Sequence, residues 1–269
     1  MKWKSINKCC SYLVVICLLA VIFGCEKEDV VDKKPGISST VEDIEGNIYE
    51  IVKIGDQVWM AENLRVTSYN DGTSIPTGLS PYEWSTTTEG AYDVFPHDYE
   101  DWPTEGIDSE EEMLDAYGAL YNWFAVDNSR GLCPEGWYVP DDQDWQELVN
   151  YIFGDGKDGN ALKSCRQVNS PLGNEYDTKE HPRWSKPQNI EQYGTDDYGF
   201  SALPGGYRYY YGTYSLIGYS GFWWSSSEFE TEESVNGLLR YMHHYSNRVM
   251  WIDGGKRYGF SVRCIKDEE

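Results

Sequence analysis

Cys25 carries the most specific chemistry in this sequence, because it directly follows the small residue Gly24 at the end of an apolar stretch over residues 11–24. Three lysines precede that stretch, which is shorter than the roughly 20 apolar residues of a membrane-spanning helix. This is the pattern of a lipoprotein signal, in which the cysteine thiol accepts a diacylglyceryl group. We therefore expect residues 1–24 to be removed and Cys25 to carry the lipid. The alternative is an ordinary secretory signal or a short membrane anchor.

Aromatic side chains are the second group that could bind a ligand, since nine rings lie between Tyr207 and Trp224 with glycines among them. Flat sugar faces stack on such rings, and protein partners contact Tyr and Trp in the same way. The alternative is that alternate residues of this segment belong to the core. We expect a ligand-binding face with Tyr209–Tyr211 as its exposed part, comprising Tyr209, Tyr210, Tyr211, Tyr214, Trp223 and Trp224.

Three cysteines remain once the signal and the lipid-bearing Cys25 are set aside, namely Cys133, Cys165 and Cys264. In an oxidising envelope compartment two of them can pair, and the residues alone do not identify the pair. Metal binding is the competing interpretation, but no CxxC or CxH spacing supports it. We expect neither a metal nor a cofactor.

The four histidines, His97, His181, His243 and His244, do not form a recognisable catalytic pattern. No HExxH sequence and no Ser-centred nucleophile elbow is present, and His243 and His244 would point to opposite faces of a strand. Residues 155–160 resemble the start of a calcium loop, but the twelfth position is Arg166 instead of glutamate. We therefore expect a protein that is not an enzyme.

The charge of the chain restricts its partners. Removing residues 1–24 takes away Lys2, Lys4 and Lys8 and no acidic residue, so the formal charge changes from -23 to -26. Nucleic acid is disfavoured because its phosphates require positive charge, and an anionic membrane surface repels the folded part. We expect contact with the membrane through the acyl chains alone.

The elements that must position these residues follow from local patterns. Residues 25–40 have the composition of a flexible tether, and residues 41–269 form the folded domain. A hairpin is predicted from residues 46–54 and 57–60 around a Gly-Asp turn. Residues 73–115 are weakly patterned and indicate mostly loop.

Two helices are expected. One begins near Glu110 and continues through Phe124, although Gly118 weakens its middle. The other begins after the N-cap Asp141 and places an apolar stripe against the core. Short strand-like runs follow from Tyr198 onward, and the pattern as a whole predicts an α+β architecture.

Seven ordered sequence blocks resemble the Fibrobacter succinogenes major paralogous domain, over nearly all of residues 41–267. The block order is also similar to the sulfatase-modifying branch of the C-type lectin-like fold. The resemblance implies an α+β domain with two helices, short antiparallel strands, long loops, and first and last strands that lie together. The blocks cover residues 59–64, 69–73, 117–123, 133–140, 199–208, 222–228 and 259–264.

The resemblance also implies a disulfide between Cys133 and Cys264, because family members usually carry both cysteines. Cys165 departs from the pattern and is expected to be a buried or idle thiol. Formylglycine-generating enzymes of the related fold use two cysteines near the end of the chain, and here only Cys264 lies there. An origin in Bacteroidota or a related phylum is implied, with an acidic start after Cys25 that fits export to the outer face.

These patterns lead to a functional hypothesis with two alternatives. The first is a non-enzymatic lipoprotein of the outer membrane, facing the cell surface, whose domain binds a carbohydrate or a protein through an aromatic, loop-built face. The second is an accessory subunit of an outer-membrane complex for glycan uptake or protein export. An enzyme of the formylglycine-generating fold ranks last.

Overall fold

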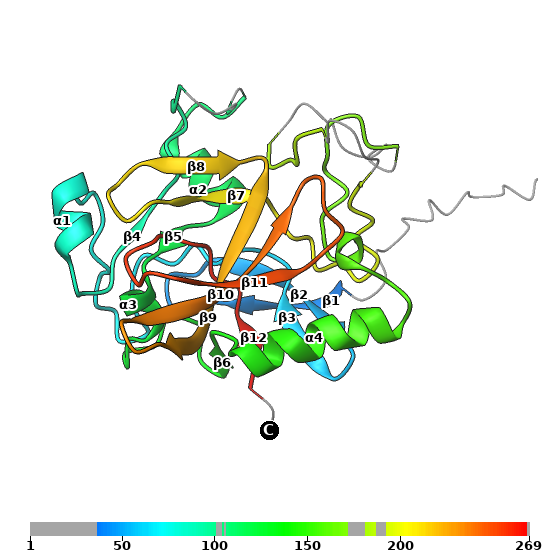
Figure 1. Cartoon of the computed structure of the whole chain (residues 1–269), viewed down its shortest axis with the longest axis horizontal. Helices are drawn as coiled ribbons and strands as arrows, with labels where there is room; N and C mark the ends of the chain where they lie inside the picture. Colours follow the sequence, from blue (N-terminus) through cyan, green and yellow to red (C-terminus); the bar gives the residue numbers. More distant parts are fainter. Residues whose placement is uncertain (1–36, 101–103, 105, 172–180, 187–191, 268–269) are drawn as a thin grey trace, which may run out of the picture. The chain divides into compact units, whose positions relative to one another are not determined.

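Two five-stranded sheets make up most of the structure, a computed structural model that describes residues 37–100, 104, 106–171, 181–186 and 192–267 (Figure 1). In the first sheet the strand order is β1-β2-β3-β12-β6, and every neighbouring pair is antiparallel. The predicted hairpin is confirmed as β2 and β3 around Gly55 and Asp56. The strands are β1 (Ile37–Glu42), β2 (Ile48–Ile54), β3 (Gln57–Met60), β6 (Trp137–Tyr138) and β12 (Ile265–Lys266).

The second sheet has the order β11-β10-β9-β7-β8, in which β7 and β9 are parallel and the other pairs are antiparallel. A separate two-stranded sheet pairs β4 with β5. The strands are β7 (Gly205–Arg208), β8 (Tyr214–Ile217), β9 (Ser220–Glu230), β10 (Val235–His243), β11 (Met250–Gly254), β4 (Tyr92–Asp93) and β5 (Leu120–Tyr121).

Helix α4 confirms the second predicted helix. Asp141 caps its N-terminus, and Asp144 completes a capping box. Its Trp145 ring lies 4.9 Å from the Trp59 ring of β3 and 6.3 Å from the Trp223 ring of β9, so the helix packs on both large sheets. The helices of the described residues are α1 (Pro81–Thr86), α2 (Glu110–Tyr117), α3 (Trp123–Val126), α4 (Asp142–Gly154) and the 3-10 helix η1 (Gly159–Ala161).

The predicted α+β, C-type lectin-like fold with two helices is wrong. The structure is mostly β, with 31% strand and 16% helix, and its two curled sheets form half-barrels. One reason is local: Gly118 adopts a φ of 77°, which favours glycine, and it ends α2 before the chain continues into β5. The last strand, β12, pairs with β3 and β6, and not with β1.

Strand β1 begins at Ile37, within the segment expected to be a tether and ahead of the expected domain start at residue 41. The predicted signal peptide, the lipid-bearing Cys25 and the rest of the tether lie outside the described residues and stay predictions. Among the residues that are described, no helix is long and apolar enough to cross a membrane.

The disulfide between Cys133 and Cys264 is confirmed, and it lies in the main core. Both cysteines are almost completely buried beside Trp224, Phe260 and other apolar residues. The bond joins residues 131 apart in the sequence and links the segment before β6 to the segment before β12. It therefore fastens the last strand into the first sheet covalently.

Replacing both cysteines (Cys133→Ala with Cys264→Ala) should lower the free energy of unfolding by about 4–5 kcal/mol, because the bond closes a very long loop in the unfolded chain. Denaturant unfolding of the full chain measures this loss. Cys165→Ala is the matched control, since this thiol is outside the disulfide, and it should change stability much less. Equal midpoints for the double variant and the parent chain would contradict the prediction.

Candidate functional site

Seven aromatic side chains on the second sheet and its loops form one continuous array, here called the tyrosine patch. The separations of neighbouring ring centroids in this array range from 4.2 to 6.2 Å. All seven side chains are half-buried or exposed, so one side of the array faces solvent. The members are Tyr207, Tyr209, Tyr210, Tyr211, Phe222, Tyr241 and Tyr258.

The turn between β7 and β8 displays three of these tyrosines. The Tyr209 N–H donates to the Thr213 carbonyl at 2.6 Å, and the Gly212 N–H donates to the Tyr209 carbonyl at 2.8 Å. Gly212 has a φ of 94°, a conformation that favours glycine, and it closes the turn. Tyr210 and Tyr211 on this turn are 43% and 50% exposed.

The sheet itself supplies the rest of the patch. Phe222 of β9 and Tyr241 of β10 are cross-strand partners, and their rings stack at 5.6 Å with an interplanar angle of 18°. The Tyr207 ring lies 5.2 Å from Phe222, and Tyr258 lies 6.1 Å from Tyr207 and 4.8 Å from Tyr209. Register and stacking thus connect the exposed turn to the sheet surface.

Three tyrosines of the patch, Tyr207, Tyr211 and Tyr258, have a raised pKa. Burial raises the pKa of Tyr207 and of Tyr258, and the nearby Tyr209 raises both further. The pKa of Tyr211 is also raised, by desolvation first and by Tyr209 second. The patch offers flat apolar rings edged by hydroxyl groups, which both donate and accept hydrogen bonds.

Trp223 and Trp224 were predicted in the ligand-binding face, and this placement is wrong. Adjacent residues of a strand point to opposite faces, and both faces of β9 are covered at this point. Trp223 packs against Trp145, whereas the Trp224 ring lies 4.6 Å from Phe260. Both tryptophans are fully buried, so neither reaches a ligand on the surface.

Tyr214 was predicted in the same face and is also misplaced. Its hydroxyl donates to Asp93 Oδ2 at 2.7 Å, and its ring lies 5.3 Å from Phe95 and 5.6 Å from Tyr99. Burial, with the nearby Asp93 carboxylate, raises its pKa. This half-buried tyrosine belongs to a second aromatic cluster that the sequence did not distinguish from the patch.

Four members of the patch were absent from the predicted face, namely Tyr207, Phe222, Tyr241 and Tyr258. Tyr207 and Phe222 lie within the aromatic segment 207–224. The signal that could have identified them is that they alternate with buried residues along their strands. Tyr241 and Tyr258 come from other segments, and only the pairing of β9 with β10 brings Tyr241 next to Phe222. Tyr209, Tyr210 and Tyr211 lie together, as expected.

A pocket of about 280 Å³ lies where segments distant in the sequence meet. Asn63 follows β3, Tyr117 ends α2, and Ser164 follows η1. Ser201, which has a φ of 51°, lines the pocket from the segment before β7. Cys165 is half-buried in the same wall, and its thiol donates to the Thr195 carbonyl at 3.3 Å.

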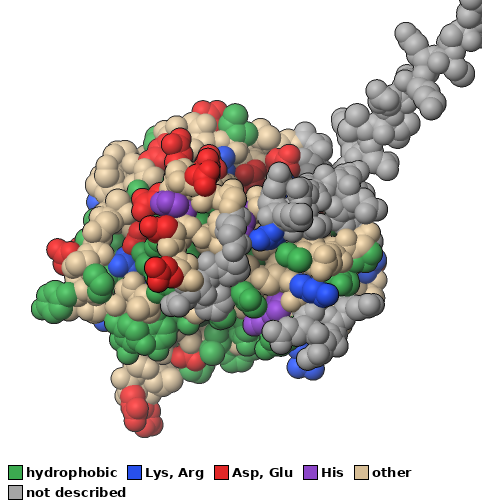
Figure 2. Space-filling model, turned by 90° about the horizontal axis from the view of Figure 1, so that it is seen from above, with side chains coloured by type: hydrophobic (Ala, Val, Ile, Leu, Met, Phe, Trp, Pro, Cys, Tyr) green, Lys and Arg blue, Asp and Glu red, His purple; other side chains and the backbone are tan. Residues whose placement is uncertain are grey.

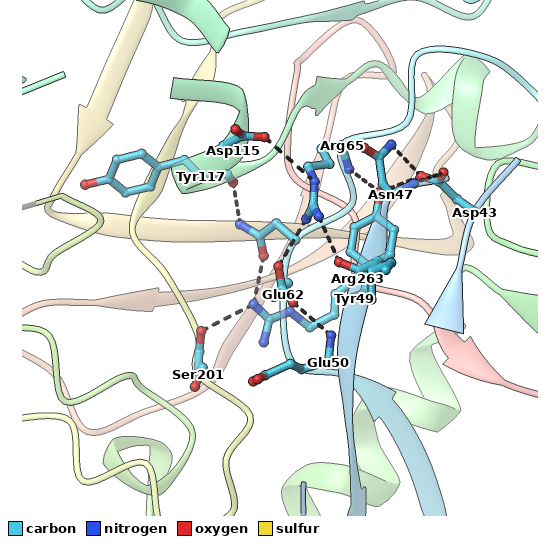
Figure 3. Close-up of polar contacts among 12 residues, drawn as sticks. Asp43, Asn47, Tyr49, Glu50, Glu62, Arg65, Asp115, Tyr117, Ser201 and Arg263 are labelled. Atoms are coloured by element: carbon cyan, nitrogen blue, oxygen red, sulfur yellow. Dashed lines mark hydrogen bonds and ion pairs between the residues drawn. The ribbon is translucent and has the colours of Figure 1, made fainter. Parts of the chain in front are cut away.

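The guanidinium of Arg263 is fully buried and connects segments that line this pocket. Arg263 Nη2 donates to Asn63 Oδ1 at 2.9 Å and to the Ser201 carbonyl at 3.4 Å, and Nη1 donates to the Phe200 carbonyl. Asn63 Nδ2 in turn donates to the Tyr117 carbonyl at 2.8 Å (Figure 3). Burial lowers the pKa of Arg263 to about 9, so the group remains charged at neutral pH.

A second arginine, Arg65, contacts two residues of the pocket lining, Glu62 and Asp115 (Figure 3). Arg65 Nη1 lies 3.1 Å from Glu62 Oε2, and Arg65 Nε lies 4.0 Å from Asp115 Oδ1. The Arg65 guanidinium also sits over the Tyr49 ring at 4.4 Å, and the Tyr49 hydroxyl donates to Asp43 Oδ2 at 2.7 Å. These contacts fix the Glu62 carboxylate in the pocket wall.

Charge is unevenly distributed over the surface. In Figure 2 acidic side chains gather over the upper part of the face shown, and apolar and tyrosine side chains gather along its lower left. Within the part of the chain that the structure describes, no group of three or more His, Cys, Asp or Glu side chains is arranged to hold a metal ion.

Comparison with known proteins identifies one family. A family model described as the Fibrobacter succinogenes major domain matches residues 52–266. No curated protein and no solved structure matches the chain. The matched range includes every member of the tyrosine patch and almost the whole lining of the pocket, in which only Glu50 precedes it.

Asn63→Ala should lower the free energy of unfolding by roughly 3–5 kcal/mol, because it removes the buried partner of Trp223 Nε1 and of the Tyr117 carbonyl and leaves Arg263 Nη2 with only the long bond to the Ser201 carbonyl. Urea unfolding of the full chain measures the loss. Asn70→Ala is the control, since Asn70 is exposed and its amide donates to a single carbonyl. Similar losses for the two variants would show that Asn63 has no special role.

Proposed function

The chain belongs to the Fibrobacter succinogenes major domain family. We propose that it is a non-enzymatic, lipid-anchored outer-membrane protein, facing the cell surface, that binds carbohydrate through the tyrosine patch. The single observation that carries the proposal is the continuous array of seven rings with one side in solvent. Sugar rings stack on such surfaces through their apolar faces, and the tyrosine hydroxyls can pair with sugar hydroxyls.

The composition of the patch supports a carbohydrate ligand over a permanent protein partner. Six of its seven rings are tyrosines, and the two most exposed, Tyr210 and Tyr211, carry hydroxyl groups. The core of an obligate protein interface is more strongly apolar. The formal charge of -26 after signal removal further favours neutral over acidic glycans.

The membrane anchor and the cell-surface location rest on the sequence. Cys25 follows a cationic start and a short apolar core, and Glu26, Glu28 and Asp29 follow the cysteine. With the lipid at one end of the chain, the folded domain would be held near the membrane while the patch stays available to soluble or cell-bound glycans.

Calorimetric titration of the full chain with soluble cello-, xylo- and manno-oligosaccharides tests the carbohydrate proposal, in a detergent that has no sugar headgroup. At least one series should bind, and Tyr210→Ala and Tyr211→Ala should each weaken that binding roughly three- to tenfold through the loss of one ring. Tyr82→Ala is the matched control, because Tyr82 is 76% exposed on α1 and outside the patch. Unchanged affinity in both patch variants would reject the patch as the binding face.

An accessory subunit of an outer-membrane complex is the second candidate, and strand β11 favours it. This strand lies at the edge of the second sheet and exposes two large apolar side chains, with Trp251 at 59% and Ile252 at 48%. Edge strands with free backbone groups are frequent sites of strand addition by a partner.

Extraction of the tagged full chain from native membranes in mild detergent, followed by mass spectrometry, tests this candidate. If the protein is a subunit, one outer-membrane partner should be recovered in stoichiometric amount, and Trp251→Ala should reduce its recovery severalfold because the exposed ring is lost. Tyr82→Ala should leave recovery unchanged. Recovery of the lipoprotein alone would eliminate the subunit proposal.

A further inference from the structure

The loop that joins β10 to β11 covers residues 244–249 and lies against the segment around η1. The Gly159 N–H donates to the Asn247 carbonyl at 2.8 Å, and Asn247 Nδ2 donates to Asp158 Oδ2 at 2.9 Å. A Cβ atom at residue 159 would lie only 2.9 Å from the Asn247 carbonyl oxygen, so this close approach requires glycine. The loop is therefore held tightly in one position.

A buried ammonium group binds the same loop from inside. Lys163 is 1% exposed, and its Nζ donates to the Ser246 carbonyl at 3.0 Å and to the His243 carbonyl at 3.4 Å. Among the described residues no carboxylate forms an ion pair with it. Burial lowers the pKa of Lys163 to about 8, so the group is still mostly charged at neutral pH.

Two histidines lie beside this charge, at the point where β10 ends. The rings of His243 and His244 are 4.7 Å apart. His244 is 4% exposed, and its Nδ1 lies 3.3 Å from the Ser185 carbonyl oxygen. His243 Nδ1 is buried and has no hydrogen-bond partner among the described residues. Protonation of His243 would therefore create a buried N–H group with nothing to donate to, next to a second positive charge.

The surroundings of the two rings contain little negative charge to balance added protons. Asp158 is the only carboxylate among the described groups that face them, and one of its oxygens accepts from Asn247. The Ser185 and Lys186 backbone partly raises the pKa of His244. The titratable side chains around the rings are Asp158 and Lys163 from the η1 region, Tyr219 from the turn before β9, and Tyr245 from the loop.

Burial and the neighbouring charges give the closed loop a low affinity for protons. Burial first, and His244 and Lys163 second, lower the pKa of His243 to about 4, and burial lowers the pKa of His244 as well. In a released loop both rings meet water and return to an ordinary pKa of about 6.5. The closed loop is therefore fully favoured above about pH 6.5 and loses stability as the pH falls from there toward 4.

We propose that the β10–β11 loop is an acid-sensitive switch, closed on the η1 region at neutral pH and released when His243 and His244 take up protons beside Lys163. This inference goes beyond the proposed glycan binding, because the switch needs no ligand. The loop joins the strand that carries Tyr241 of the tyrosine patch to the edge strand that carries Trp251. Its release loosens one end of both surfaces.

Hydrogen exchange with mass spectrometry tests the switch on the full chain in detergent, with labelling times corrected for the chemical exchange rate at each pH. Between about pH 7.5 and about pH 5, peptides covering residues 244–249 should lose roughly thirtyfold of their protection through His243 alone, since its pKa differs between about 4 and about 6.5 in the two forms. Peptides of the β2–β3 hairpin should keep theirs. Unchanged protection of the loop, or an equal loss over the whole domain, would overturn the proposal.

Variants assign the acid response to the two rings. His243→Phe with His244→Asn removes both titrating groups, while it keeps an aromatic ring and an amide donor toward the Ser185 carbonyl, and the acid-induced loss of protection should disappear. His97→Asn is the matched control and should respond to acid like the parent chain. Acid release that persists in the double variant would overturn the assignment.

A second measurement requires no variant. In carbon-detected NMR spectra of the full chain with labelled histidine, at least two of the four histidines should titrate well below the ordinary pKa of about 6.5. Four ordinary titrations would show that His243 and His244 are not held in the neutral form, and the switch would be rejected even if the double variant failed to fold.

Discussion

The domain is organised around a buried positive charge whose described hydrogen-bond partners are all neutral. Removing a guanidinium from water costs several kcal/mol, and Arg263 recovers part of that cost from the Phe200 and Ser201 carbonyls and the Asn63 amide oxygen. Neutral acceptors must be held accurately to be effective. Asn63 is fixed by the Tyr117 carbonyl, so the charge at Arg263 links the end of α2, the segment after β3 and the segment before β7. The pocket exists where these three segments meet.

Strand β9 imposes the second constraint, because both of its faces are covered over part of its length. Trp223 belongs to the core cluster around α4, and Trp224 belongs to the cluster that contains the disulfide. On the same side of the strand as Trp224, Phe222 is only half-buried and lies beside Tyr241. The tyrosine patch thus continues, at the surface, the face of β9 that carries Trp224 in the core. Its rings are positioned by the same stacking that orders the interior, through Phe260 beneath Phe222 and Tyr258.

Local signals in the sequence correctly predicted the elements whose formation depends on neighbouring residues alone. The Gly-Asp hairpin and helix α4 follow from turn chemistry, capping and apolar spacing, all of which act over a few residues. The disulfide pair followed from family resemblance, since three cysteines alone left the pairing open. The fold class was wrong because the pairing partners of short strands depend on long-range contacts. β12 contributes two residues, and its position between β3 and β6 has no local signature. Only part of the patch was predicted, for the same reason. The Tyr209–Tyr211 turn is a local feature, whereas Tyr241 and Tyr258 are brought to the patch by long-range contacts.

The two surfaces differ in what they can select, although the acidic charge of the chain acts on both in the same direction. The tyrosine patch is open and carries no charge of its own, so it recognises shape and apolar area. The pocket is small, and two of its wall carboxylates, Glu62 and Asp196, are held by Arg65 and by Ser201, so it limits a ligand by size.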